Sequence, residues 1–375
     1  MVRIATMAEA MPGSLKLCYG ESDMPTPPFI CDAASRAMTD GHTFYTHTAG
    51  CPELREAIAA KILELHGVAC RPCEIAATLG ASMAIFLAIR AHIGPGDNAV
   101  ILSPGYAIFS NAVIIAGGEP RAVPLARSGR RFELDVDRVL GAIDGHTRML
   151  IVNSPSNPTG WVMTDAERRA LYEIAVRHDL VILSDEVYER LVYETSLAPS
   201  FARVADDRDR VIVVNSFSKT YNMTGWRLGW AQSGERTIRL MYQAAEFMTS
   251  NPAAMIQQAG IVALREGDAY VRELRAHYAA RRAQVIDAFS SVSGVSLPEP
   301  EGAFYAFPRI EGLIDSAQFT VDLLRDTGVA LAPGAGFGAS GEGHVRLCFA
   351  AKEQTLSEAL GRVCDYLSAH ARASR

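Results

Sequence analysis

Runs of apolar residues and amphipathic helical repeats alternate through the middle of the chain. Four apolar runs have the length and composition typical of strands buried on both faces, at residues 99–102, 149–152, 180–183 and 211–214. Between the second and third runs, Thr164 and Glu167 form a capping box ahead of a helical apolar repeat. A further helix is predicted over residues 52–66. This alternation predicts an α/β fold whose sheet is largely parallel.

The pattern changes after Gly267. A long charged helix is predicted over residues 270–289, and a shorter α/β segment follows it. That segment is expected to contain residues 302–307, a helix at 319–326, strands at 329–332 and 345–349, and a last helix with an apolar stripe. We predict a large domain of residues 46–284 and a small domain from both chain ends, residues 1–45 and 285–375. The N-terminal residues are placed there because the run PTPP is a poor start for a central strand.

Composition narrows the class of protein. The chain has 375 residues, 49% of them hydrophobic and 21% charged, which is typical of a globular enzyme. A net charge of −6 offers no electrostatic footprint for nucleic acid, and the densest apolar stretch is too short to span a membrane. Seven scattered cysteines favour a reducing compartment. We therefore expect a cytoplasmic protein whose partners include neither nucleic acid nor membrane.

Polar clusters follow three of the apolar runs, at residues 153–160, 184–188 and 215–219. Ligands of parallel α/β sheets bind outside the carboxyl ends of the strands, so we expect these clusters to converge. Taken singly, Lys219 could be a solvated surface lysine, Asp185 a helix cap and Arg227 a surface residue. Together, an amine, a carboxylate, a guanidinium and several hydroxyls suit an anionic aldehyde cofactor, because a desolvated amine attacks carbonyls.

The motifs SPSNPTG, SDEVYE, SFSKTYNMTGWRLG and VRLCFA, in this order, resemble the class I/II aminotransferases of the aspartate aminotransferase superfamily. The resemblance runs from about residue 20 to residue 350. It implies the type I fold of pyridoxal-phosphate enzymes, with a large domain around a mostly parallel sheet and a small α/β domain from both chain ends. It also implies a homodimer with shared active sites. The substrates implied are an amino acid and a 2-oxo acid.

The resemblance also implies roles for individual residues. Lys219 would bind pyridoxal 5′-phosphate as an imine and carry the proton, and Asp185 would pair with the ring nitrogen. A carboxylate there keeps the ring protonated and electron-withdrawing. Tyr188 and Asn157 would hydrogen-bond the phenolic oxygen. The catalytic set is therefore Lys219, Asp185 and Tyr188.

Other residues would hold the remainder of the cofactor. A helix is predicted to start near Ala81, and the amides at a helix start suit a phosphate dianion. Tyr106 would stack on the ring, although a core tyrosine is an alternative. Tyr45 resembles the tyrosine that reaches the phosphate of the neighbouring subunit. The phosphate ligands implied within one chain are Ala81, Ser82, Ser216, Ser218 and Arg227.

Substrate recognition is assigned to Arg346, Gly20 and Asn157. Arg346 alternates with the apolar residues of a predicted strand, and its guanidinium offers a bidentate fork for an α-carboxylate. An exposed salt bridge is the alternative for Arg346. Gly20 matches the loop over the substrate, and Ser22 stands where the family usually has proline.

Several other motifs were weighed and rejected. Residues 336–341 spell a dinucleotide fingerprint, but a strand is predicted after them where the fingerprint needs a helix. Cys70, Cys73 and His66 offer three zinc ligands, whereas a closed site needs four, so we predict no metal. No GxSxG elbow is present. A regulator's effector domain would need a DNA-binding module, for which residues 1–20 leave no room.

The predicted reaction is therefore transamination by a ping-pong mechanism. A lyase or cyclase with the same site residues remains open, because both use the same carbanion. For the donor, Glu246 stands where dicarboxylate-specific members carry an arginine, four residues before Ser250. A solvated Glu246 or a different local alignment is the alternative. If Glu246 reaches the neighbouring pocket, it disfavours aspartate and glutamate and favours basic donors.

Overall fold

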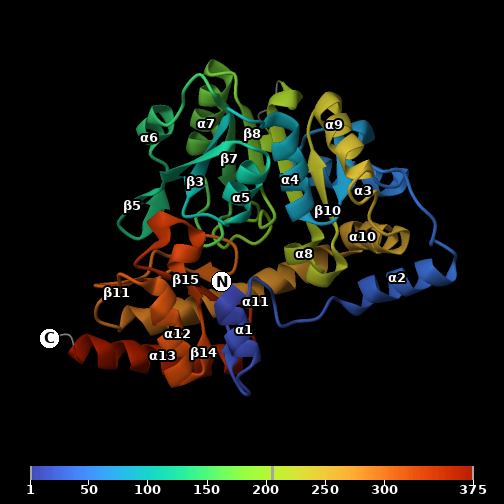
Figure 1. Cartoon of the computed structure of the whole chain (residues 1–375). Helices are drawn as coiled ribbons and strands as arrows, with labels where there is room; N and C mark the ends of the chain where they lie inside the picture. The colour runs from blue at the N-terminus through green and yellow to red at the C-terminus, as the bar shows by residue number, and fades with distance from the viewer. Residues whose placement is uncertain (1, 204–206, 374–375) are drawn as a thin grey trace.

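A seven-stranded sheet forms the centre of the computed structural model, which describes residues 2–203 and 207–373 (Figure 1). Its strands lie in the order β2 (Ile75–Thr78), β10 (Gly229–Gln232), β9 (Val211–Ser216), β8 (Val181–Asp185), β7 (Thr147–Asn153), β3 (Asn98–Ser103) and β4 (Glu119–Pro124). Strand β10 is antiparallel to both neighbours, and the other adjacent pairs are parallel. The predicted α/β fold with a mostly parallel sheet is confirmed.

The four apolar runs are β3, β7, β8 and β9, and each is buried between two layers of helices. In β7, Leu150 and Val152 pack in one core with helix α7 (Asp165–Arg177). Met149 and Ile151 point the other way and pack with α4 (Ala81–His92), α5 (Ile108–Ile115) and α9 (Glu235–Glu246). Because both faces are covered, successive residues are all apolar.

The predicted helix over residues 52–66 is α3 (Pro52–His66). It begins with a proline in its first turn and ends at Gly67, whose φ of 70° lies in the left-handed region that favours glycine. The capping box of α7 is also present. The Thr164 hydroxyl accepts from the Glu167 amide at 3.2 Å, and the Glu167 carboxylate accepts from the Thr164 amide at 2.7 Å.

The C-terminal part of the chain forms small sheets below the central one (Figure 1). Helix α11 (Asp268–Ser290) leads into it, and α12 (Ser316–Thr327) and α13 (Glu353–Ala373) cover it. Strand β1 (Leu15–Lys16) pairs in parallel with β14 (Val329–Ala330), so both chain ends meet there beside α1 (Val2–Glu9). Helix α2 (Pro28–Thr39) instead shares a core with α3 and α10 (Ala254–Glu266). The division at residues 45 and 285 stays a prediction.

One predicted strand was wrong in its extent. Residues 329–332 form two short strands, β14 and β15 (Ala332–Pro333), with Leu331 between them. The chain changes partners there, since β14 pairs with β1 whereas β15 pairs antiparallel with β16 (Val345–Cys348). A continuous apolar run cannot reveal such a change of sheet, because both halves are equally buried.

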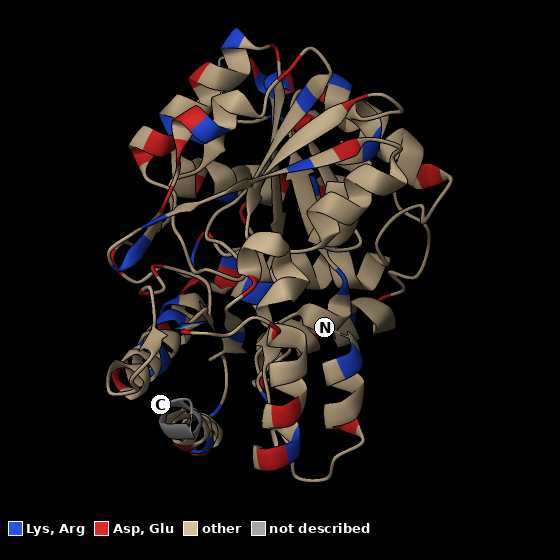
Figure 2. Cartoon of the chain, turned by 60° about the vertical axis from the view of Figure 1, so that its left-hand side comes forward, with Lys and Arg blue, Asp and Glu red and all other residues tan. Residues whose placement is uncertain are grey.

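The remaining elements are short and connect the larger ones. They are β5 (Ala126–Ser128), β6 (Arg131–Glu133), α6 (Val136–Gly141), α8 (Phe217–Thr220), β11 (Val295–Ser296), β12 (Tyr305–Ala306), β13 (Arg309–Ile310) and the 3₁₀ turns Pro72–Glu74, Phe201–Arg203, Arg208–Arg210, Thr224–Trp226, Gly334–Phe337 and Ala339–Gly341. Acidic and basic residues are interspersed over the outer helices and loops (Figure 2). Within residues 2–203 and 207–373, no helix has the length and apolarity that a bilayer span requires.

Candidate active site

A cavity of about 470 Å³ opens at the carboxyl ends of β7, β8 and β9. This is a typical volume for a small-molecule site. The three polar clusters meet there as predicted, since Asn157, Asp185 and Lys219 all line it. The other predicted residues on its walls are Gly20, Ala81, Ser82, Tyr106, Tyr188, Ser216, Ser218, Arg227 and Arg346.

Lys219 presents a buried amine to this cavity. It lies on the short helix α8, directly after β9, and its Nζ donates a hydrogen bond to the carbonyl of Gly20 at 2.6 Å. Burial lowers the pKa of Lys219 to about 8, because the charged ammonium loses its hydration. A fraction of the amine is therefore neutral and nucleophilic near physiological pH.

Asp185 is the last residue of β8 and is 5% exposed. Burial raises the pKa of its carboxyl to about 7, and the Val187 amide, which donates to Oδ1 at 3.3 Å, opposes that rise only in part. The carboxylate lines the cavity, and the surrounding protein groups offset only part of the cost of burying its negative charge. A cation placed there would restore its ordinary ionisation.

Ser216 and Ser218 also line the cavity. Ser216 caps α8 through the Ser218 amide at 3.1 Å, and the two hydroxyl oxygens are 3.0 Å apart. The first turn of α4 brings Ala81 and Ser82 to the same cavity. Amide groups at a helix start, together with hydroxyls, make a cradle for an anion.

Arg227 lines the same cavity and adds a positive charge to this cradle. Its backbone has a φ of 55°, an uncommon conformation for a residue with a side chain. The guanidinium donates to the carbonyls of Thr224 at 2.9 Å and Leu79 at 3.3 Å. Gly80, with a φ of 77°, lies beside it, and a Cβ there would come within 2.3 Å of Arg227 Nη2. Only glycine lets the guanidinium approach the start of α4.

Arg346 also lines the cavity, lies on β16 and is 2% exposed. It donates to Asn157 Oδ1 at 3.1 Å and to the carbonyl of Cys18. The rings of Tyr305 and Phe337 lie 4.7 and 5.0 Å from its guanidinium carbon. Its Nε is buried without a hydrogen-bond partner in the described part of the chain. An exposed salt bridge, the alternative considered for Arg346, is wrong.

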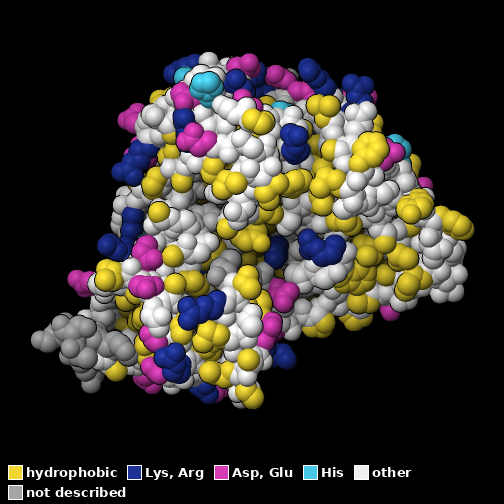
Figure 3. Space-filling view, viewed as in Figure 1, with side chains coloured by type: hydrophobic (Ala, Val, Ile, Leu, Met, Phe, Trp, Pro, Cys, Tyr) yellow, Lys and Arg dark blue, Asp and Glu magenta, His cyan; other side chains and the backbone are white. Residues whose placement is uncertain are grey.

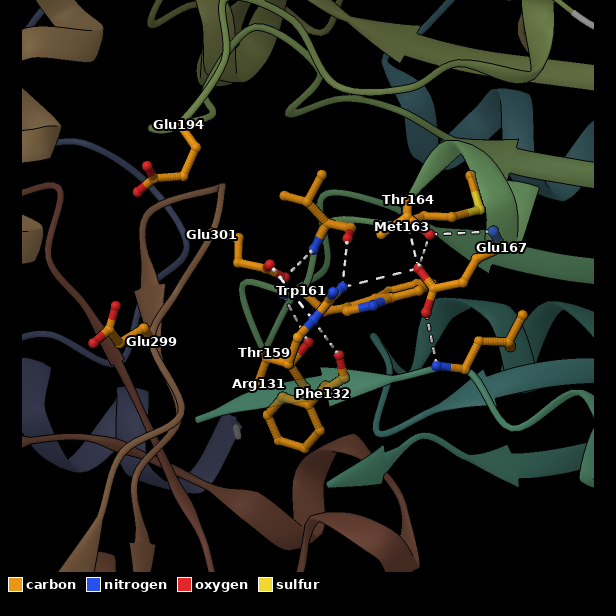
Figure 4. Close-up of polar contacts among 12 residues, drawn as sticks. Arg131, Phe132, Thr159, Trp161, Met163, Thr164, Glu167, Glu194, Glu299 and Glu301 are labelled. Carbon is orange, nitrogen blue, oxygen red and sulfur yellow. Dashed lines mark hydrogen bonds and ion pairs between the residues drawn. The ribbon is translucent and has the colours of Figure 1, made fainter. Parts of the chain in front are cut away.

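The loop that carries Asn157 is fixed by a polar network at its far end (Figure 4). The Val162 amide donates to Glu301 at 3.1 Å, and the Trp161 amide donates to the Thr159 hydroxyl at 3.2 Å. Arg131 bridges the carboxylates of Glu301 at 3.6 Å and Glu167 at 3.9 Å. The loop is thereby tied both to α7 and to the segment before β12.

Tyr106, Tyr45 and Glu246 each had more than one possible place in the sequence analysis. Tyr106 is 38% exposed and lines the cavity, so the core-tyrosine alternative is wrong. Tyr45 is 92% exposed and stands outside the set of described residues that line the cavity. Glu246 is exposed at the end of α9 and likewise stands outside that set. Tyr45 and Glu246 therefore do not line the site within the single chain.

Residues 336–341 form 3₁₀ turns and are followed by strand β16, which confirms the strand predicted in place of the helix that a dinucleotide fingerprint needs. The structure also adds a residue that the motifs missed. Tyr305 is fully buried on β12, lines the cavity, and has its hydroxyl 2.8 Å from that of Tyr188, 117 positions away in the chain. A tyrosine in a two-residue strand gives no local signal of so distant a partner.

These residues fit pyridoxal phosphate. The cavity offers a buried amine, a buried carboxylate with little compensation, and an anion cradle of hydroxyls, helix amides and Arg227. A cofactor with an aldehyde, a basic ring nitrogen and a phosphate has one group for each. Arg346, with a donor still unused, remains for a substrate carboxylate.

Known proteins resemble this chain over nearly its whole length. Residues 12–363 match the family model of aminotransferase class I and II. An aspartate aminotransferase of Pyrococcus abyssi is 36% identical over 365 residues, covering 96% of this chain and 93% of the relative. Aromatic-amino-acid aminotransferase 2 of Thermococcus litoralis is 36% identical over the same shares of the two chains. The crystal structure of an aromatic aminotransferase from Pyrococcus horikoshii OT3 superposes with a TM-score of 0.92 at 36% identity, covering 98% of this chain and 99% of that chain.

Fold and site thus define an α/β enzyme with the type I fold of pyridoxal-phosphate transferases. The chain belongs to the aminotransferase class I and II family. The predicted family, fold and enzyme class are confirmed. These relatives are named as aminotransferases, and they give no support to the lyase or cyclase alternative.

Proposed function

We propose that the protein moves the amino group of an L-amino acid to a 2-oxo acid, using pyridoxal phosphate bound at Lys219. The observation that carries this proposal is the cavity itself, where the Lys219 amine, with its pKa near 8, shares walls with Asp185 and Arg346. When bound, the cofactor supplies an aldehyde for the amino group and a ring that accepts electrons.

The residues that line the cavity would each bind a different part of the cofactor. Asp185 holds the positive charge of a protonated ring nitrogen, which also relieves the cost of its own burial. Tyr188 and Asn157 would orient the phenolic oxygen, and Tyr106 would cover the ring. The phosphate would be held by the start of α4, Ser216, Ser218 and Arg227.

Lys219 would act twice in this scheme. Its neutral amine would hold the cofactor, and once released by an incoming amino acid, the same amine would accept the proton from the substrate Cα. Arg346 and Asn157 hold the substrate carboxylate, so that Cα lies within reach of Lys219. Because the first oxo acid would be released before the second one binds, we expect ping-pong kinetics.

The working unit is proposed to be a homodimer with shared active sites. Exposed hydrophobic side chains gather over α2 and α10 (Figure 3). A groove of about 650 Å³ there is lined by Met38, Trp226 and Met255, and the nearby Phe44 and Tyr45 are 82% and 92% exposed. Exposed apolar patches of this kind mark interfaces. A second copy on this face would cover Tyr45 and bring it to the neighbouring phosphate.

All seven cysteines are free thiols. Their state supports the proposal that the protein works in a reducing compartment, the cytoplasm.

The test is an amino-transfer assay with purified protein and added pyridoxal phosphate. An amino donor and a 2-oxo acid should together give a new amino acid and a new oxo acid, with parallel double-reciprocal plots. Omitting the 2-oxo acid should stop the reaction after one turnover per site. Steady release of an oxo acid with ammonia, in the absence of an acceptor, would instead identify a lyase.

A further inference from the structure

Tyr305 contacts residues from two parts of the proposed site, the cofactor ligands and the carboxylate ligand. Its hydroxyl oxygen is 2.8 Å from that of Tyr188 and 3.4 Å from the carbonyl oxygen of Gly20. Its ring centre is 4.7 Å from the guanidinium carbon of Arg346. A Cβ at Gly20 would come within 2.7 Å of the Tyr305 hydroxyl, so the Gly20 loop is packed directly against it. One side chain therefore touches a proposed cofactor ligand and the proposed carboxylate ligand.

The hydroxyls of Tyr188 and Tyr305 form one hydrogen bond, in which only one of them can donate. Burial raises the pKa of Tyr188 and of Tyr305 above the ordinary value, so both hydroxyls are protonated at neutral pH. Only one proton can occupy the bond between the two oxygens, and each phenol has one to give. If Tyr305 gives the proton to this bond, the proton of Tyr188 is free to point into the cavity.

The distances from the Tyr305 hydroxyl to its two neighbours favour donation from Tyr305 to Tyr188. The alternative acceptor for Tyr305, the Gly20 carbonyl, is the more distant of its two neighbours at 3.4 Å. In the cofactor-free protein, that carbonyl also accepts from Lys219 Nζ at 2.6 Å. Donation from Tyr305 to Tyr188 therefore makes the shorter bond and leaves Tyr188 as a donor toward the cavity.

The ring of Tyr305 has a separate effect on Arg346. The guanidinium lies between this ring and that of Phe337, at 4.7 and 5.0 Å. Two aromatic neighbours restrict the guanidinium and attract its charge. The hydrogen bonds to Asn157 and to the Cys18 carbonyl then fix its rotation. Hydroxyl and ring can be removed separately by substitution.

We propose that Tyr305 is a positioning residue that serves both ends of the site. Its hydroxyl directs the Tyr188 proton toward the cofactor's phenolic oxygen, and its ring holds Arg346 in the orientation that meets the substrate carboxylate. The inference rests on the proposed function, since both partners act on a cofactor or substrate of that reaction.

The first test follows the visible absorbance of the holoenzyme with pH, for wild type, Tyr305→Phe and Tyr193→Phe. A donor to the phenolic oxygen favours its anionic form and lowers the midpoint of this titration. Loss of the Tyr305 hydroxyl should raise the midpoint by about half a pH unit or more, which is the scale of one weakened hydrogen bond. Tyr193→Phe is the matched control, because that hydroxyl donates to the nearby Ala303 carbonyl. Equal midpoints for the two variants would overturn the role of the hydroxyl.

The second test asks whether Tyr305 acts through Tyr188. In the Tyr188→Phe background, Tyr305→Phe should move the midpoint no further, because the hydroxyl it orients is already gone. Additive shifts in the double variant would mean that Tyr305 acts by another route, and would overturn the proposal.

Thermal unfolding of each cofactor-free variant verifies that the compared proteins are folded. If Tyr305→Phe alone does not fold, Tyr305→His keeps a donor on a ring and should retain the wild-type midpoint, whereas a shifted midpoint would count against the proposal.

The third test separates the ring from the hydroxyl. Tyr305→Phe keeps the ring and should leave KM for the amino donor within about twofold, whereas Tyr305→Leu should raise it about threefold to tenfold, the scale of a cation–π contact. Equal KM values for the two variants would overturn the ring's role. Failure of the proposed function looks different, since wild type itself would then show neither amino transfer nor a pH-dependent visible band.

Discussion

Arg346 and Asn157 are hydrogen-bonded to each other although 189 positions separate them in the chain. Arg346 Nη1 donates to Asn157 Oδ1 over 3.1 Å, and both side chains line the cavity that also contains Lys219. Asn157 comes from the loop after β7, whereas Arg346 comes from β16 in the C-terminal part of the chain. This bond joins the central sheet to the C-terminal part, at the point where the substrate carboxylate is proposed to bind.

Replacing Arg346 by lysine should reduce kcat/KM for amino acids about 10- to 100-fold. A lysine keeps the charge but offers no planar pair of donors, and a charge-assisted hydrogen bond is worth about 1.5–3 kcal/mol. The effect should fall mainly on KM, measured with several amino donors. The matching decarboxylated amines, which lack the carboxylate, should be used equally slowly by both proteins. If Arg346→Ala served amino acids and amines alike at wild-type rates, Arg346 would not be the carboxylate ligand.

Replacing Lys219 by methionine should abolish turnover and stabilise the cofactor-free protein. The folded-state pKa of Lys219 is about 8, below its ordinary value, so burying the ammonium destabilises the wild type at pH 7. The cost is on the order of 3 kcal/mol and is fully present below pH 8. It should vanish as the pH rises through the unfolded value of about 10.4, where the amine is neutral in both states.

The measurement is urea unfolding of the cofactor-free proteins at pH 7 and pH 10.5. Lys352→Met serves as the control, because Lys352 is exposed. The free energy of unfolding of Lys219→Met should exceed that of wild type at pH 7 and approach it at pH 10.5. A difference that does not change with pH would show that desolvation of the amine is not its cause.

Sequence patterns were sufficient for the fold where the environment of a segment is uniform. Strand β7 is apolar throughout because helices cover both its faces, and α3 and α7 carry their own start and stop signals. The pattern failed at Leu331, where equally buried residues pair with different sheets. The motifs likewise predicted that residues at or after strand ends, such as Asp185 and Lys219, lie in one cavity.

What the motifs missed depends on contacts between distant segments. Tyr305 meets Tyr188 across 117 positions, and the Gly20 carbonyl meets Lys219 across 199. Neither contact follows from local periodicity, because it arises only when the C-terminal sheets and the N-terminal loop close over the central one. Tyr45 is exposed in the single chain, so its predicted contact with a phosphate would need a second copy of the protein.

Replacing Asp185 by asparagine should lower turnover by several orders of magnitude and weaken cofactor binding more mildly. The amide has nearly the same shape but cannot hold the charge of a protonated ring nitrogen, so the ring becomes a poor electron acceptor. Single-turnover absorbance changes would locate the loss in the proton-transfer step, and cofactor titration would measure binding. Asp179→Asn, which changes a carboxylate that is 93% exposed, is the matched control. Near-normal rates in Asp185→Asn would mean that another group protonates the ring.

The last prediction concerns the amino donor. Glu246 ends α9 and is exposed, directly before Phe247, which is 90% exposed. Both residues are therefore available to a second chain. If the partner's cavity receives Glu246 in the dimer, a distal carboxylate on the substrate is repelled and a cationic side chain is attracted. We expect arginine or ornithine to outrank aspartate and glutamate as donors.

A panel of arginine, ornithine, aspartate, glutamate, phenylalanine and alanine, compared by kcat/KM, tests this preference for basic donors. Glu246→Arg should reverse the order of basic and acidic donors, whereas Glu235→Arg, at the exposed start of the same helix, should not change it. A wild type that prefers aspartate, or a Glu246→Arg variant with the wild-type order, would show that Glu246 is a solvated residue without a part in choosing the donor.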